Sequence, residues 1–211
     1  MAHNFKGKFI VIEGIELNGK DTHAAALSKY FFFKNKAHSV VLTREPTKLT
    51  EEGRLLRKML VEMKEPQKEK EKLFELYIAD RRKHVEGLII PALKFGSTVI
   101  CDRFKHSTIA IQGALGIPVE KIIEAHKGMI VPDLTIILDI TIDEYAKRFS
   151  ESASTHNEVF DEDKELMIKI RENYMRMPEL LPDENIKFIS SMEPFEEVHQ
   201  KVIAEVEKIL S

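Results

Sequence analysis

The stretch that decides the fold reads Phe9-Ile10-Val11-Ile12-Glu13-Gly14-Ile15-Glu16-Leu17-Asn18-Gly19-Lys20-Asp21-Thr22. A short β-branched run opens it, and residues 20–36 carry apolar side chains at helical spacing, so a strand, a loop and a helix follow one another. The loop contains the complete pattern G-x-x-x-x-G-K, which binds nucleotide phosphates in this context. The glycines let successive backbone N–H groups face one anion, and the new helix adds its positive end. The residues of this loop that are predicted to form the nucleotide cofactor site are Gly14, Glu16, Leu17, Asn18, Gly19, Lys20, Asp21 and Thr22.

The position after the lysine departs from the usual phosphate loop. Asp21 stands where Ser or Thr is expected, and Thr22 follows one place later. A carboxylate near phosphates is repelled unless it faces Mg²⁺ or solvent, so Asp21 and Thr22 are the candidate metal ligands of this loop. Lys20 brings a mobile cation to the outer phosphates. The alternative, a helix-capping glycine turn with an incidental lysine, fits the preceding strand less well.

Four further β-branched runs divide the rest of the chain. They occupy residues 40–43, 98–101, 134–138 and 187–190. Between and after them, segments such as 69–95 and 193–210 place apolar residues three or four apart. Nearly continuous apolar runs are typical of strands buried on both faces, and strand–helix alternation predicts a parallel sheet. With 211 residues and no internal repeat or Gly/Ser-rich linker, we expect one domain (residues 1–211), a three-layer α/β/α sandwich with a five-stranded parallel sheet.

Composition narrows the functional class. The chain has 43% hydrophobic residues, a net charge of −3 and a single cysteine, Cys101. This slightly negative net charge does not indicate nonspecific binding of nucleic acid. A single cysteine excludes a disulfide framework or a cysteine-based zinc cluster. No apolar run approaches the ~20 residues that span a bilayer, and the first residues lack the apolar region of a signal peptide. We therefore expect a cytoplasmic protein whose partners are small molecules.

Two arginines indicate a second phosphate site. Arg44 and Arg103 each follow a predicted strand, on the edge where ligands bind in open α/β folds. The guanidinium fork matches phosphate oxygens in pairs. A surface salt bridge is the alternative for either arginine alone, but two of them on the phosphate-loop edge favour a phosphorylated acceptor.

Several blocks of sequence, in order, carry a family resemblance. They are Phe9–Gly14 with the phosphate loop, Thr43-Arg44-Glu45-Pro46-Thr47, Ala79-Asp80-Arg81 with His84, Val99-Ile100-Cys101-Asp102-Arg103-Phe104 with Ser107-Thr108 and Gln112-Gly113, and Val131-Pro132-Asp133-Leu134. Together they resemble the thymidylate kinases, P-loop nucleoside monophosphate kinases, over nearly the whole chain. The resemblance implies a nucleotide kinase fold, ATP and Mg²⁺ as cofactors, and a homodimer.

The resemblance also implies how the acceptor is bound. Tyr77 occupies the position that stacks on the pyrimidine, although an ordinary core aromatic is the alternative there. Arg81, one helical turn on, is implied to contact the base edge, and Thr108 and Gln112 to hydrogen-bond the base. The remaining implied substrate-binding residues are Glu16, Arg44, Glu45, Arg57 and Arg103.

Catalysis is implied to rest on charge rather than on a base. The attacking phosphate oxygen is already ionised near pH 7, so positioning and charge neutralisation carry phosphoryl transfer. Lys20 and Arg103 are the implied cations, and Asp102 is implied to act on Mg²⁺ or on the acceptor phosphate.

Two departures from the family pattern bear on the activity. Ile111 replaces a tyrosine that is credited with crowding the sugar 2′ position. The lid segment, residues 149–163, carries carboxylates and no Lys or Arg, and the phosphate loop offers Leu17 and Asn18 where an arginine could stand. Arg148, at the start of the lid, is the candidate substitute for the missing catalytic arginine.

Three hypotheses follow. The leading one is ATP-dependent phosphorylation of dTMP to dTDP, which supports DNA precursor synthesis. The second is a kinase of another nucleoside monophosphate with relaxed sugar selection, because Ile111 loosens the 2′ position. The third is a catalytically silent nucleotide-binding homologue that lacks lid arginines.

Overall fold

The computed structural model describes residues 3–63, 65–151 and 163–210. Its five strands are all parallel and form one sheet in the order β2-β3-β1-β4-β5. The strands are β1 (Phe9–Glu13), β2 (Val40–Arg44), β3 (Thr98–Asp102), β4 (Leu134–Asp139) and β5 (Ile186–Ser190). Each one contains a β-branched run of the sequence, so the predicted five-stranded parallel sheet is confirmed.

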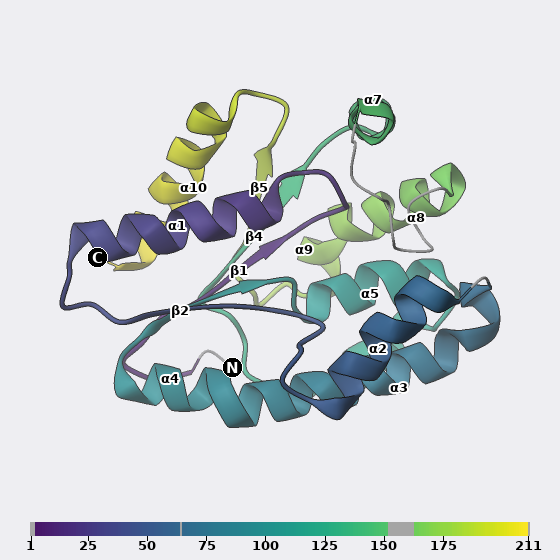
Figure 1. Cartoon of the computed structure of the whole chain (residues 1–211), viewed down its shortest axis with the longest axis horizontal. Coiled ribbons are helices and arrows are strands. Elements are labelled where there is room, and N and C mark those ends of the chain that lie inside the picture. The colour runs from purple at the N-terminus through teal and green to yellow at the C-terminus, as the bar shows by residue number, and fades with distance from the viewer. Residues whose placement is uncertain (1–2, 64, 152–162, 211) are drawn as a thin grey trace.

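Helices cover both faces of this sheet (Figure 1). They are α1 (Lys20–Lys34), α2 (Glu51–Glu62), α3 (Pro66–His84), the π-helix η1 (Val85–Ile89), α4 (Ile90–Phe95), α5 (Lys105–Ala114), α6 (Val119–Ala125), α7 (Ile142–Glu151), α8 (Lys164–Met175), α9 (Met177–Leu180) and α10 (Phe195–Leu210). Helices α1 and α10 lie side by side on one face, whereas α3, α4 and α5 lie on the other. The predicted three-layer sandwich is therefore confirmed.

The sheet divides the core in two, because successive side chains of a strand point to opposite faces. Ile10 and Ile12 of β1 pack with α1 and α10, while Phe9 and Val11 pack on the side of η1 and α4. The central strands β1 and β3 are buried throughout, as the apolar runs predict. Strands β2 and β5 are partly exposed, because each is an edge strand with a neighbour on one side only.

The helical stretch predicted for residues 69–95 is continuous but changes its pitch at η1. Pro91 has no backbone N–H, and its ring would clash with the carbonyl of Gly87, four residues back. The N–H of Ile90 bonds instead to the carbonyl of Val85, five residues back, which is the π-helical pattern. This wider turn accommodates Pro91 without ending the continuous helical segment of α3, η1 and α4.

The parallel strands bring the predicted ligand residues to one edge. The phosphate loop follows β1, Arg44 ends β2, and Asp102 and Arg103 follow one another at the end of β3. Most of the predicted lid, residues 149–163, lies outside the described residues. Its first residues end α7, and Asp163 caps α8 by accepting the N–H of Leu166 at 2.9 Å. None of the described helices is both long and apolar enough to cross a membrane.

Candidate active site

The phosphate loop is braced from inside by Asn18. Its Nδ2 donates to the carbonyl of Leu138 at 2.7 Å, and its Oδ1 accepts the N–H of Lys20 at 3.1 Å. Gly14 has a φ of 131°, and a Cβ there would lie 2.1 Å from Asn18 Nδ2 and 2.4 Å from Leu138 O, so only glycine fits. The Asn18 side chain thus shapes the loop, and its role in cofactor binding stays a prediction.

Glu16 joins the two cations that flank the loop. Its Oε2 lies 2.8 Å from Lys20 Nζ, and its Oε1 accepts from Arg103 Nη2. Burial alone would raise the pKa of Glu16, but the charges of Arg103 and Lys20 outweigh it and hold this pKa far below its ordinary value. Glu16 is therefore ionised and pairs with Lys20 of the phosphate loop and with Arg103 at the end of β3.

Arg103 is held by a buried network that starts from Glu13. Arg103 has a φ of 69°, which turns the chain sharply between β3 and α5. Glu13 Oε1 accepts the N–H groups of Phe104 at 2.7 Å and Ser107 at 3.1 Å, and Oε2 accepts the Tyr174 hydroxyl at 2.8 Å. Arg103 Nη1 donates to Ser107 Oγ at 2.9 Å and to Gly14 O at 3.1 Å. The network fixes this arginine against the phosphate loop.

Asp102 carries the clearest site for a cation. Its Oδ2 accepts from Arg44 Nη2 at 2.6 Å, whereas its Oδ1 is buried and has no partner in the described chain. Buried carboxylate oxygens are normally satisfied, so this one fits a metal ion or a proton donor on a ligand. Asp21 Oδ1, by contrast, accepts the N–H of Thr22 at 2.8 Å. Both residues stay predictions as metal ligands.

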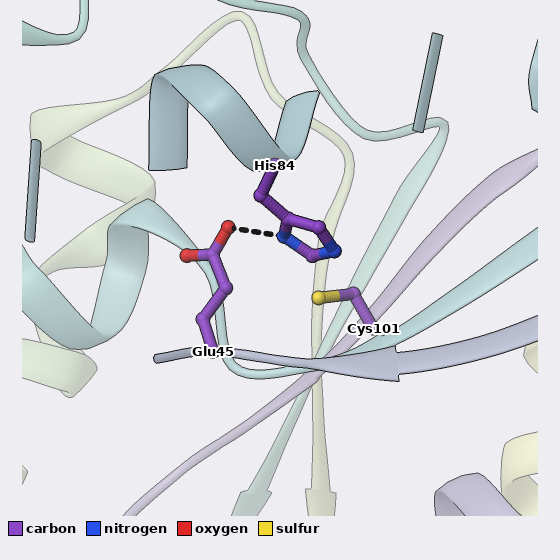
Figure 2. Close-up of side chains that lie close together, drawn as sticks. All are labelled: Glu45, His84 and Cys101. Carbon is purple, nitrogen blue, oxygen red and sulfur yellow. Dashed lines mark hydrogen bonds and ion pairs between the residues drawn. The ribbon is translucent and has the colours of Figure 1, made fainter. Parts of the chain in front are cut away.

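Arg81 lies at the other end of the site and is only 1% exposed. Its Nε donates to Glu45 Oε2 at 2.6 Å, and its Nη1 donates to Thr108 Oγ1 at 2.9 Å. Glu45 Oε1 in turn accepts from His84 Nδ1 at 2.9 Å. Figure 2 shows this carboxylate and the His84 ring facing each other, with the Cys101 thiol beside the ring. Glu45 thus orients Arg81 and is itself held by His84.

The triplet of Glu45, His84 and Cys101 has the spacing of a metal site but not its chemistry. One ligand atom of each lies within 4.8 Å of the others. Both carboxylate oxygens are already taken, and the guanidinium of Arg81 would repel a cation. Burial, followed by the negative charge of Glu45, raises the pKa of the Cys101 thiol well above its ordinary value, so it stays protonated. The cluster is a support for Arg81.

A cavity of about 240 Å³ connects the phosphate loop to Arg81. The predicted residues that line it are Glu16, Leu17, Gly19, Lys20, Asp21, Arg44, Glu45, Arg57, Tyr77, Arg81, Asp102, Arg103, Thr108 and Gln112. The described lining does not include the predicted residues Gly14, Asn18, Thr22 and Arg148. Both amide atoms of Gln112, and Nε of Arg57, are buried without a partner in the described chain. The cavity wall therefore holds polar atoms that a ligand can satisfy.

Arg148 lies against the phosphate loop with its nitrogens engaged. Its Nη1 donates to the carbonyl of Leu17 at 3.0 Å, Nη2 to the carbonyl of Ser191 at 2.8 Å, and Nε to Glu144 at 2.7 Å. Arg171, the next basic residue considered, pairs with both carboxylate oxygens of Asp139 at 2.8 Å. Arg148 is thus close to the loop, and its catalytic role stays a prediction.

Sequence reasoning missed several supporting residues. Glu13 gave a usable signal, because a carboxylate inside an apolar strand has to find partners. Tyr174 and His126 gave none, since their contacts with Glu13 and Arg81 span 161 and 45 positions. Ser107, which lines the cavity, was part of a motif but was not assigned a role.

The fold and the cavity define a P-loop nucleotide kinase, a phosphotransferase with a donor loop and an acceptor site on the same sheet edge. Residues 12–202 match the thymidylate kinase family. A probable thymidylate kinase of Thermococcus kodakarensis is 38% identical over 96% of this chain and 98% of its own length. The thymidylate kinase of Desulfotalea psychrophila is 32% identical over 98% of both chains.

A solved structure agrees with these sequence matches. The thymidylate kinase of Ehrlichia chaffeensis superposes with a TM-score of 0.75 at 28% identity, covering 95% of this chain and 98% of that one. The chain belongs to the thymidylate kinase family. The family resemblance drawn from the sequence blocks is confirmed.

Proposed function

We propose that this protein transfers the γ-phosphoryl group of ATP to dTMP, giving dTDP and ADP, and that the cavity between Lys20 and Arg81 holds the acceptor. Membership of the thymidylate kinase family supports the reaction. The phosphate loop receives ATP, because its glycines and the N-terminus of α1 present N–H groups to an anion.

The observation that carries the acceptor assignment is Gln112. A primary amide with both donor and acceptor buried and unpartnered matches a ring that offers an acceptor beside an N–H, as the imide edge of thymine does. Arg81 adds N–H donors for a ring carbonyl, and the aromatic ring of Tyr77 lines the same cavity. A cytosine ring offers no such N–H and carries an amine where thymine has an oxygen.

Charge placement accounts for the chemistry. An ionised oxygen of the acceptor phosphate forms the new P–O bond as the bond between the γ-phosphorus and the ADP oxygen breaks. Arg103 and Arg44 hold the acceptor phosphate from the ends of β3 and β2, and Lys20 neutralises the donor phosphates. Glu16, between Lys20 and Arg103, limits how far these two cations can separate.

We further propose that Asp102 holds Mg²⁺ through its unpartnered Oδ1, with Asp21 and Thr22 as further candidate ligands. When bound, Mg²⁺ neutralises phosphate charge during transfer. We also propose a cytoplasmic homodimer, on the basis of the family resemblance. Tyr77, Arg57 and Thr108 are proposed to bind the acceptor.

A substrate panel tests the function. Release of ADP, measured by a coupled assay, is compared for dTMP, dUMP, UMP, CMP and GMP. We expect turnover with dTMP and, more weakly, dUMP. Efficient turnover of a ribonucleotide supports the kinase with relaxed sugar selection, and ATP binding without any turnover supports the silent homologue.

Two leucine variants test the site. Gln112→Leu removes both amide atoms from the cavity, and we expect it to raise KM for dTMP about tenfold while KM for ATP changes little. Gln200→Leu, an exposed position on α10, is the matched control. An unchanged KM for dTMP in the Gln112 variant would exclude base recognition by this amide.

A further inference from the structure

His126 contacts a different nitrogen of Arg81 from the one that Glu45 contacts. It follows α6, is 5% exposed, and its Nε2 lies 2.6 Å from Arg81 Nη1. Its other ring nitrogen, Nδ1, lies 2.7 Å from the carbonyl of Ile122. Both ring nitrogens are therefore engaged inside the protein.

These two contacts determine the tautomer. A guanidinium only donates, so Nε2 must accept from Arg81, and a carbonyl only accepts, so Nδ1 must carry the ring proton. Burial, followed by the charge of Arg81, lowers the pKa of His126 from 6.5 to about 2. The uncharged ring therefore presents the lone pair of Nε2 to Arg81 throughout the physiological pH range.

The proton count of Arg81 shows what this contact does. A guanidinium has five N–H protons. Glu45 takes the one on Nε, and Thr108 and His126 take the two on Nη1. The pair on Nη2 meets no acceptor in the described part of the chain, and Arg81 lines the acceptor cavity. The guanidinium carbon Cζ of Arg81 lies over the ring of Phe104, 5.3 Å from the ring centroid.

We infer that His126 is a positioning residue for acceptor recognition: as an uncharged acceptor it fixes Arg81 Nη1, so that Nη2 presents its two protons to a carbonyl oxygen of the acceptor base. This inference rests on the proposed function. Without His126, Thr108 would satisfy only one of the two Nη1 protons. A rotation of the Arg81 side chain that brought the other proton to a new partner would also move Nη2 away from the ligand. His126 removes that alternative.

The space behind His126 provides a means of testing this. His126 also lines a second cavity of about 1000 Å³, together with Lys105, Ile123 and Glu184. Truncation at position 126 therefore opens a path from this cavity to Arg81. A small molecule of the deleted chemistry, imidazole, can enter by this path.

The experiment compares His126→Ala, His126→Gln and His38→Ala in steady-state kinetics at pH 7.5. We expect His126→Ala to raise KM for dTMP about tenfold, with kcat and KM for ATP within about twofold of the wild type. The Gln variant keeps a non-titrating acceptor and is expected to recover most of the affinity for dTMP. His38, which contacts Thr98 at the opposite end of β3, is the control and is expected to change nothing.

Added imidazole at millimolar concentration is expected to lower KM for dTMP in His126→Ala and to leave the wild type and His126→Gln unaffected. Equal losses for dTMP and ATP, or failure of both Gln and imidazole to restore KM, overturn the inference in favour of a purely structural role. An unchanged KM in His126→Ala overturns it as well. A wild type that turns over no dTMP overturns the proposed function and this inference together, whereas an active wild type isolates His126.

Discussion

The two sides of the site hold their arginines differently. On the acceptor side, Arg81 is 1% exposed, and its partners are side chains that leave Nη2 to the cavity. On the donor side, the side chain of Arg148 is 27% exposed, and all three of its nitrogens already donate to protein oxygens, two of them backbone carbonyls. Arg81 on the acceptor side is thus preorganised for a ligand, whereas Arg148 on the donor side is already bound to protein oxygens, including the carbonyl of Leu17 in the phosphate loop.

This difference indicates where specificity and rate originate. Preorganised donors in a buried site favour one ligand over another, because a wrong ligand leaves them unpartnered. Arg148 must exchange at least one protein oxygen for a phosphate oxygen before it can neutralise the transferring group. Substitutions on the acceptor side should therefore change mainly KM for dTMP, whereas a substitution at Arg103, which is proposed to hold the acceptor phosphate, should also lower kcat.

The largest effect is expected for Arg103→Ala. This variant removes the guanidinium that pairs with Glu16 and that is proposed to hold the acceptor phosphate, so kcat/KM for dTMP should fall by about 10³. Steady-state kinetics with varied dTMP measures it, and Arg176→Ala, an exposed arginine before α9, is the control. A loss of less than tenfold would show that Arg44 and Lys20 suffice for the acceptor phosphate.

Arg148→Ala is expected to have the next largest effect. If Arg148 neutralises the transferring phosphoryl group, as the sequence predicts, its loss should lower kcat by about 10², with a much smaller change in KM for ATP. Single-turnover kinetics separates chemistry from release, and Lys147→Ala, the exposed neighbour on α7, is the control. If kcat is unchanged, Arg148 serves only to tie Leu17 to α7.

The third prediction concerns the free energy of unfolding, which should decrease at acid pH because His126, on the acceptor side, is buried without charge. The pKa of His126 is about 2 in the folded protein and near 6.5 when unfolded, so the unfolded chain binds the extra proton first. The stabilisation is complete well above pH 6.5 and decreases as the pH falls below this value, by about 2.7 kcal/mol at pH 4.5. Urea unfolding at pH 7.5 and 4.5 measures this loss. His126→Gln lacks the titrating group and should lose correspondingly less, so equal losses would contradict the buried, uncharged ring.

Local patterns explain which features the sequence could predict. The five strands and the phosphate loop are each encoded within a few consecutive residues, and parallel pairing then brings Arg44 and Arg103 to one edge. Glu45 is predicted to bind substrate and lines the cavity, but its partners Arg81 and His84 are 36 and 39 residues away, so only the fold shows that it also orients Arg81. His126 was missed for the same reason.

The smallest effect is expected at Ile111, which lines the acceptor cavity from α5. A tyrosine there would place a ring and a hydroxyl where the resemblance locates the sugar 2′ position. Crowding by one group in an apolar wall changes discrimination by roughly 1 kcal/mol, so Ile111→Tyr should raise the kcat/KM ratio of dUMP over UMP about fivefold. These two substrates differ only at the 2′ carbon, and Ile111→Phe separates bulk from the hydroxyl. A ratio that does not move in either variant would contradict sugar selection by the side chain at position 111.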